Sequence, residues 1–320
     1  MNANRAEHYR PRTGLLYAVG GTFLLATNYC TAKYATGGFD PGTFALVWTS
    51  AAAFYSLVIC FATRRTRELA VPRRAVWALA LLGVCTGAGM LLGWAALDRL
   101  DPSFAAFLSR FTTVMTTILG VVLLRERLRG MEVVAMGVMV TGGLISTLGR
   151  WEIVGLGVVL MLLACVAAAA QNLIAKVYVR TIHPSSLVFW RLAIGAGVIA
   201  VWVVGGGAVD VQVPARYWAV VLLGAFLGPC LGHHFIFRAY RCWDLARVAI
   251  VGTTGPILTF LLALAVFGRL PAGRELRGGG IILLGAFLLV WIHFGMRWRL
   301  RKPACHDAEG DAAKAGRTQE

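Results

Sequence analysis

Ten blocks of apolar residues, each about 20 residues long, run through this chain of 320 residues with hardly a charge inside them. A helix of about 20 residues crosses the ~30 Å hydrocarbon core of a bilayer, so each block predicts one transmembrane helix. Short connections with helix-breaking pairs, such as Asp40-Pro41 and Asp101-Pro102, separate the blocks. The sequence therefore predicts an all-α integral membrane protein. The ten predicted transmembrane helices are residues 14–34, 41–62, 75–97, 102–124, 131–148, 153–178, 185–206, 215–238, 244–267 and 278–297.

The composition argues against the soluble classes of protein. Hydrophobic residues make up 58% of the chain, charged residues make up 14%, and the mean hydropathy is +0.70. A net charge of +16 would suggest a nucleic-acid partner in a soluble protein, but here the basic residues lie between the apolar blocks and in the tails. We therefore expect no nucleic acid as a partner. The expected partners are a small-molecule substrate and the lipid bilayer, with a homodimer as one possible assembly.

No motif in the sequence indicates a cofactor or a metal site. The seven cysteines show neither a CxxC pair nor the spacing of secreted proteins, and we interpret them as packing residues. Lysine and arginine then indicate the orientation, because cytoplasmic loops are enriched in them. Most of them fall on one side if both termini are cytoplasmic, and the connection with Arg269, Arg274 and Arg277 is the exception. The expected location is the cytoplasmic (inner) membrane, with a multi-pass chain and both termini cytoplasmic.

The second half of the chain repeats the first. A shift of 143 residues, without a gap, brings identical or similar residues together over five spans. Because five is an odd number, the second copy must cross the membrane in the opposite orientation, which predicts two inverted five-helix repeats. Inverted pairs are typical of secondary transporters that work by alternating access. The aligned pairs include Asn28 with Gln171, Gly89 with Gly232, Glu132 with Glu275, and Gly142 with Gly285.

Several stretches resemble the EamA-type repeat of the drug/metabolite transporter superfamily. They are residues 94–106, 124–128 and 137–143 in the first half, residues 238–240, 255–256 and 280–285 in the second, and residues 27–33 in the first span. The resemblance implies a ten-helix carrier of small metabolites or drugs, often outward, whose cavity is lined mainly by the third, fourth, eighth and ninth spans. The expected units are a cytoplasmic N-terminus (1–13), two repeats (14–149 and 150–298) and a disordered cytoplasmic tail (299–320).

Four residues are candidates for gating or structural roles. The family's proline in the ninth span is Pro256, whereas Thr113 occupies the aligned position in the fourth span. The family's glutamate at the end of that span is Glu126, and the second copy has an arginine in its place. The two gates are therefore expected to differ chemically. Gly89 and Gly232 belong to ridges of small residues that let helices approach closely or slide.

Arg110 is the strongest candidate for substrate binding. It lies about 13 Å into the fourth span, near the midplane, where a charge costs at least ~2.5 to 3.5 kcal/mol on insertion scales. Its forked donors could bind a carboxylate or phosphate of the substrate, or it could bond to backbone carbonyls and only join helices. Arg191 lies closer to the end of the seventh span, so we expect its side chain to extend to the interface.

Six further residues are candidates for substrate contact. The polar pair Asn28 and Gln171 either bridges helices or lines the path. Histidines can titrate near neutral pH, but each could also simply donate a hydrogen bond between helices. The same histidines could instead serve a multi-pass membrane enzyme, which is the alternative function. No second catalytic partner lies within a span, so we expect no enzyme activity and propose a transporter. Beside Asn28 and Gln171, the candidates are His233, His234, Trp94 and Tyr240, the two aromatics as possible stacking groups.

Overall fold

The computed structural model is helical throughout the part of the chain that it describes, and it contains no strand there. It describes residues 11–64, 66–71, 75–124, 130–147, 151–178, 182, 184–206, 209–210, 212–242, 245–268 and 273–299. The helices are α1 (Pro11–Ala35), α2 (Pro41–Ala62), the short 3-10 helix η2 (Thr66–Leu69), α3 (Val76–Arg99), α4 (Pro102–Leu108), α5 (Phe111–Leu124), α6 (Gly130–Thr147), α7 (Trp151–Tyr178), α8 (Pro184–Gly205), α9 (Ala215–Ala225), the π-helical η4 (Phe226–Gly232), α10 (His233–Cys242), α11 (Leu245–Gly252), α12 (Gly255–Phe267) and α13 (Gly273–Arg299).

The Asp-Pro pairs of the connections start helices. Asp40 caps α2, since its carboxylate accepts hydrogen bonds from the backbone N–H of Gly42 (2.9 Å) and of Thr43 (3.3 Å). Asp101 caps α4 in the same way by accepting from the N–H of Ser103 at 2.9 Å. The proline that follows each aspartate fits the first turn, where no intrahelical partner is needed for its missing N–H.

The exposed surface is that of a membrane protein. Nine segments within the described residues are long and apolar enough to cross a bilayer, and α1, which is long enough but richer in polar side chains, is a tenth possibility. Large apolar side chains lie on the outside, such as Leu16 and Trp202, each 72% exposed. An exposed apolar surface of this extent matches lipid contact rather than water. The predicted fold class is confirmed.

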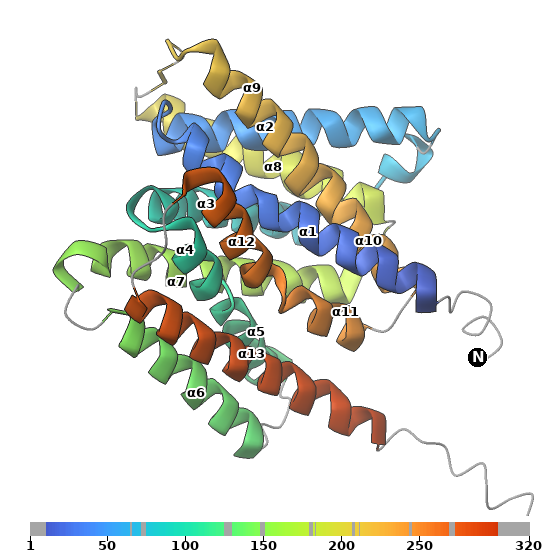
Figure 1. Cartoon of the computed structure of the whole chain (residues 1–320). Helices are drawn as coiled ribbons and strands as arrows, with labels where there is room; N and C mark the ends of the chain where they lie inside the picture. Colours follow the sequence, from blue (N-terminus) through green and yellow to red (C-terminus); the bar gives the residue numbers. More distant parts are fainter. Residues whose placement is uncertain are drawn as a thin grey trace, which may run out of the picture.

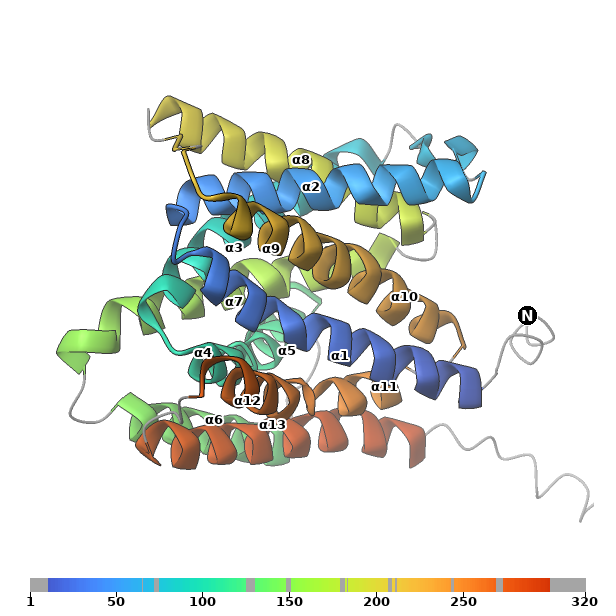
Figure 2. The same ribbon diagram turned by 45° about the horizontal axis from the view of Figure 1, so that its top comes forward.

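The spans form a central group between two edge pairs. Figure 2 shows α2 with α8 at one edge and α6 with α13 at the other. Between them lie α1, α3, α7 and three spans that are each divided into two or more helical pieces (α4 and α5; α9, η4 and α10; α11 and α12). The beginning of α1 and the end of α13 lie on the same side of the molecule (Figure 1).

The edge pair α6 and α13 packs with reciprocal contacts. A Cβ added at Gly142 would lie 2.7 Å from the carbonyl oxygen of Gly278 and 2.8 Å from the amide nitrogen of Ile282. A Cβ added at Gly285 would lie 2.9 Å from the carbonyl oxygen of Ala135 and 2.9 Å from the amide nitrogen of Met139. The second set of contacts repeats the first with the roles of α6 and α13 exchanged. The two helices run antiparallel. Each helix also buries a glutamate in its first turn, Glu132 in α6 and Glu275 in α13.

Candidate functional site

The fourth and ninth spans are interrupted at equivalent places. Between α4 and α5 the helix tightens, and the N–H of Arg110 donates to the carbonyl of Phe107 three residues back at 3.1 Å. Between α11 and α12 the N–H of Thr253 does the same with Ile250 at 3.1 Å. Positions 110 and 253 coincide in the 143-residue register. The sequence predicted two uninterrupted spans here, with only a bend near Pro256, so the break in the fourth span corrects that prediction.

The side chain of Arg110 joins the two interruptions. Its Nη1 donates a hydrogen bond of 2.9 Å to the carbonyl oxygen of Gly252, the last residue of α11. In a continuous α-helix this carbonyl would accept from the N–H of residue 256, but that residue is Pro256, which has no N–H. Arg110 therefore supplies the donor that the proline lacks. A cation at the C-terminal end of α11 is also favoured by the helix dipole.

The rest of the Arg110 guanidinium group faces polar side chains. Its Nε is buried and has no hydrogen-bond partner among the described residues, although the side chain as a whole remains partly exposed. The phenol of Tyr29 lies in hydrogen-bonding contact with Ser109 and close enough to Arg110 to act on it electrostatically. The hydroxyl of Thr22 is buried and has no hydrogen-bond partner in the described ranges. A Cβ added at Gly255 would lie 3.6 Å from the methyl group of Thr22 and 3.9 Å from Nη2 of Arg110. The charged guanidinium group of Arg110 and the neutral hydroxyl groups of Tyr29 and Thr22 are thus neighbours.

Sequence reasoning found Arg110 but missed the α1 side chains around it. Thr22 and Tyr29 are seven residues apart, so they project from the same face of α1, and this spacing could have indicated a shared polar face. Cys165 of α7, interpreted as a packing residue, lies with its Sγ 3.6 Å from the carbonyl oxygen of Leu108. The thiol contacts the end of α4.

The structure places the gating candidates at helix contacts. Pro256 is buried in the first turn of α12, directly after the interruption. Gly89 faces α7, where an added Cβ would lie 3.4 Å from the Cβ of Ala167, and Gly232 faces α1, where it would lie 3.0 Å from Leu25. Both glycines therefore lie against the first helix of the other half. Glu126 lies outside the described residues.

The aligned polar pair Asn28 and Gln171 contacts neighbouring helices in both cases. Gln171 Nε2 donates to the hydroxyl of Thr86 at 2.8 Å, which joins α7 to α3. Asn28 packs against Gly228 of η4, so closely that a Cβ at position 228 would collide with the amide. Its Oδ1 is buried without a hydrogen-bond partner among the described residues. Helix bridging accounts for Gln171, whereas Asn28 retains a free acceptor.

Trp94 lies in a cluster of three aromatic rings. Its ring centroid is 5.4 Å from that of Phe44 and 5.5 Å from that of Trp48, in edge-to-face geometry, and the side chain is 7% exposed. This arrangement packs α3 against α2. The side chain of Tyr240 lies outside the described residues.

The two histidines sit at the end of a π-helical segment that contains Pro229. His234 Nδ1 is 2.8 Å from the carbonyl oxygen of Cys230, and His233 hydrogen-bonds the backbone of Gly228 and Pro229. The carbonyl oxygen of Cys230 also accepts from the backbone N–H of His233, so His234 adds a second donor to it in a segment where π turns and a proline alter the regular backbone pairing. Within the described residues no three His, Cys, Asp or Glu side chains form a group that could hold a metal ion.

Arg191 does not extend to the interface as the sequence predicted. It is 7% exposed, and its Nε and Nη2 are buried with no hydrogen-bond partner among the described residues. It lies close enough to His233 and His234 to act electrostatically on both. Helix α8 packs against α2, α3 and α10, and the side chain lies inside the bundle, which a prediction based on depth along one helix could not foresee.

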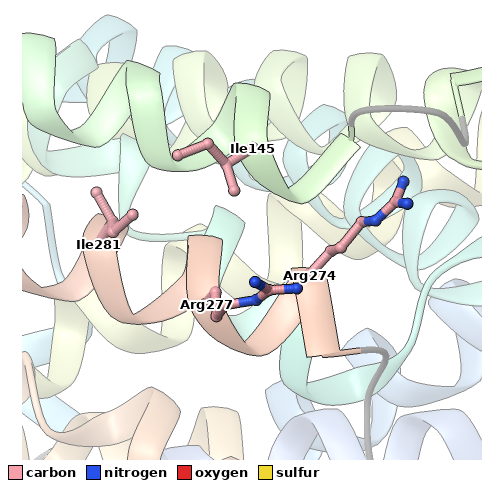
Figure 3. A pocket seen from close by; sticks show the side chains of 4 residues that line it. All are labelled: Ile145, Arg274, Arg277 and Ile281. Carbon is pink, nitrogen blue, oxygen red and sulfur yellow. The ribbon is translucent and has the colours of Figure 1, made fainter.

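An open pocket of about 530 Å³ lies elsewhere, on the edge pair. It is lined by Ile145 of α6 and by Arg274, Arg277 and Ile281 of α13 (Figure 3). This end of α6 and α13 faces away from the beginning of α1 and the end of α13 (Figure 1). None of the predicted substrate-binding residues lines this pocket, so it is separate from the Arg110 site.

Comparison with known proteins adds the family. The sequence model described as the EamA-like transporter family matches residues 12–148 and matches again at residues 155–291. The chain belongs to the EamA-like transporter family. Both ends of the second EamA match lie 143 residues after those of the first, which is the register of the repeat. The predicted family is confirmed, and the chain is a multi-pass membrane transporter with two EamA repeats. Members of the EamA family are transporters rather than enzymes.

The solved structures support the fold alone. One crystal structure matches with a TM-score of 0.63 and 17% sequence identity, and the match covers 92% of this chain and 100% of the other. No curated protein matches the sequence.

Proposed function

We propose that this EamA-family protein is a secondary transporter that moves a small organic solute with a carboxylate or phosphate group by alternating access. The observation that carries the proposal is the position of Arg110. It lies where two interrupted spans meet. One of its donors binds the carbonyl of Gly252, and another, Nε, has no hydrogen-bond partner within the described part of the chain. A buried cation in a span is costly unless it is paired, and a solute anion would pair it.

The surrounding groups suit an anionic solute with further polar atoms. The Nε of Arg110 can donate to an oxyanion, and the hydroxyl groups of Thr22 and Tyr29 can donate to or accept from its other polar groups. Discontinuous helices bind substrates in this way in many transporters, because the backbone groups at a break are free to interact. The solute would compete with no carboxylate of the site, since none contacts Arg110 among the described residues.

Alternating access is supported by the relation between the two halves. The interruptions occupy equivalent positions in both repeats, and the edge helices α6 and α13 make exchanged contacts while running antiparallel. We propose that residues 14–149 and 150–298 are inverted repeats that exchange conformations. The solute would then meet Arg110 from one side of the membrane and leave it towards the other.

The proposed direction is outward across the cytoplasmic membrane, with both termini in the cytoplasm. The excess of lysine and arginine on the side of the termini supports the orientation, and the family resemblance supports export. Labelling of a single cysteine added to each terminus with a membrane-impermeant reagent in intact cells tests the orientation. We expect labelling only after the cells are opened.

The experiment that tests the function compares metabolites inside and outside cells that make the wild type, Arg110→Ala, Arg110→Lys or Arg99→Ala at equal membrane abundance. Arg99 is the matched control, because it is exposed and bonds only the carbonyl of Ala95 in its own helix at 3.1 Å. We expect the wild type and Arg99→Ala to export the same class of anionic or zwitterionic solute, which Arg110→Ala does not move. Equal export by Arg110→Ala would show that the arginine is structural.

A further inference from the structure

Arg191 is a second buried guanidinium group, remote in sequence from the site at Arg110. Seven residues separate it from the start of α8, which is about 10 Å along the helix. The fourth and seventh spans enter the membrane from opposite sides, so Arg110 and Arg191 are reached from opposite faces of the membrane. Arg191 aligns with Trp48 in the 143-residue register, and the first repeat therefore has no counterpart of this group.

The neighbours of Arg191 are basic. His233 and His234 lie within electrostatic range of it, and Arg238 acts on His234 in turn. His234 directs Nδ1 to the carbonyl of Cys230, and its Nε2 is buried with no partner among the described residues. Because Nδ1 faces a carbonyl oxygen, it carries the proton of the neutral ring, and Nε2 is then an acceptor that becomes a donor to an anion only when the ring is protonated.

We propose that Arg191 and His234 form a second anion-binding site, which holds the carboxylate or phosphate group of a small molecule. Nε and Nη2 of Arg191 are buried without a hydrogen-bond partner among the described residues, and the side chain is more than nine-tenths buried. The unpaired Nε2 of His234 belongs to a ring within electrostatic range of Arg191. A guanidinium group without water or a partner is unfavourable in this environment, and an oxyanion supplies two acceptors in the geometry of its fork. When His234 takes up a proton, Nε2 becomes a further donor to the same anion. The site does not depend on the role of Arg110.

The test measures anion binding by the purified full-length protein in nanodiscs of phosphatidylcholine, a lipid without net charge. The thermal unfolding midpoint is followed while sodium acetate or sodium phosphate replaces sodium chloride at constant ionic strength. A ligand that binds the folded state raises this midpoint with concentration. We expect acetate, phosphate or both to raise it in the wild type. Acetate alone would identify a carboxylate ligand, and phosphate alone would identify a phosphate or phosphorylated ligand.

Three variants locate the binding. Arg191→Gln is expected to weaken the anion effect at least tenfold, and His234→Asn is expected to weaken it several-fold, because asparagine can keep the bond to Cys230 but lacks the second nitrogen. Arg216→Gln is the control, since this exposed arginine stacks on Tyr217 at 4.8 Å from the ring centroid and should leave the effect unchanged. If Arg191→Gln does not fold, Arg191→Lys and His234→Asn still decide the question.

Two results would overturn the proposal. One is an anion effect of the same size in the wild type, Arg191→Gln and His234→Asn, which would place the binding elsewhere. The other is a wild type whose midpoint responds to neither acetate nor phosphate. A transport defect of Arg110→Ala with an intact anion effect would leave the second site standing, so failure of one proposal is distinguishable from failure of the other.

Discussion

Arg110 donates to the carbonyl oxygen of Gly252 across 2.9 Å, and Pro256 is the reason that this oxygen is free to accept. The two repeats are thus joined at their interruptions by a donor from one half and an acceptor from the other. Arg110 can hold the helices together with Nη1 and still present Nε to a ligand. The structural and the binding interpretations of this residue are therefore compatible, and they can be separated by experiment.

A double-mutant cycle measures the structural part. We expect Arg110→Met to be better tolerated in a Pro256→Ala background than in the wild type, by about 1–3 kcal/mol, because the new N–H at position 256 can serve the carbonyl of Gly252. The measurement is the free energy of unfolding of the four proteins in the same detergent. Additive effects of the two changes would contradict the role of Pro256. Transport that stays lost in the stabilised double variant would assign Arg110 a part in binding.

The contact between α6 and α13 predicts opposite effects for two kinds of glycine. Gly142→Ala and Gly285→Ala should each destabilise the protein by about 1–3 kcal/mol, since the added methyl group would collide with the facing helix. Gly137→Ala and Gly280→Ala are the controls, because nothing lies within 4 Å of a Cβ at either position. These changes should be neutral or stabilise the helix by about 0.5–1 kcal/mol. Thermal unfolding of the four variants checks the prediction, which is wrong if both kinds lose the same stability.

The hydrogen bond between Gln171 and Thr86 should contribute to stability as an interhelical bond. Gln171→Leu is expected to destabilise the protein by about 0.6–2 kcal/mol, a typical range for polar contacts between membrane helices. Thr116→Val is the control, because the hydroxyl of Thr116 bonds only the carbonyl of Thr112 in its own helix at 2.7 Å. Unfolding in detergent gives both values. A loss that is no greater for Gln171→Leu than for Thr116→Val would argue that the amide serves another purpose.

Lys33 caps the end of α3 from α1. Its Nζ donates to the carbonyl oxygens of Leu97 at 2.8 Å and Asp98 at 2.7 Å, two of the last carbonyls of α3, where regular α-helical partners run out. The N–H of Leu100 also donates to the Leu97 carbonyl, at 3.3 Å. Lys33→Met should therefore destabilise the protein by about 1–2 kcal/mol and increase amide hydrogen exchange over the last turn of α3. Arg99→Met, which removes a bond within one helix, should change exchange much less. Unaltered exchange in Lys33→Met would contradict the capping role.

The sequence predicts the spans well because their length and apolar character are set by the thickness of the bilayer. The helix starts at Asp40 and Asp101 were equally readable, since Asp followed by Pro satisfies the first turn. The interruption at Arg110 was not found, because no proline marks it. The repeat could have indicated it, because a shift of 143 residues aligns the segment just before Pro256 with the segment around Arg110 in the fourth span.

Burial of individual side chains was harder to foresee. Arg191 and Arg110 occupy comparable depths on their helices, and the packing of α8 within the bundle, against α2, α3 and α10, decides that Arg191 stays inside. Glu132 and Glu275 are buried in the first turns of α6 and α13, although one sequence gives no information about which helix covers them. The contacts of Trp94 with Phe44 and Trp48 were equally unforeseen, and its role as a stacking group for the substrate stays a prediction.

The donor, Arg110, belongs to the first repeat and Pro256 belongs to the second, so the two halves contribute different groups to the contact between them. A chain assembled from two copies of the first half would bury two guanidinium groups at its centre and have no proline-exposed carbonyl to receive them. A chain assembled from two copies of the second half would have two such carbonyls and, at each position equivalent to Arg110, a threonine such as Thr253. The two halves are therefore complementary at this crossing, because the repeat is retained in the backbone interruptions but not in the side chains that join them.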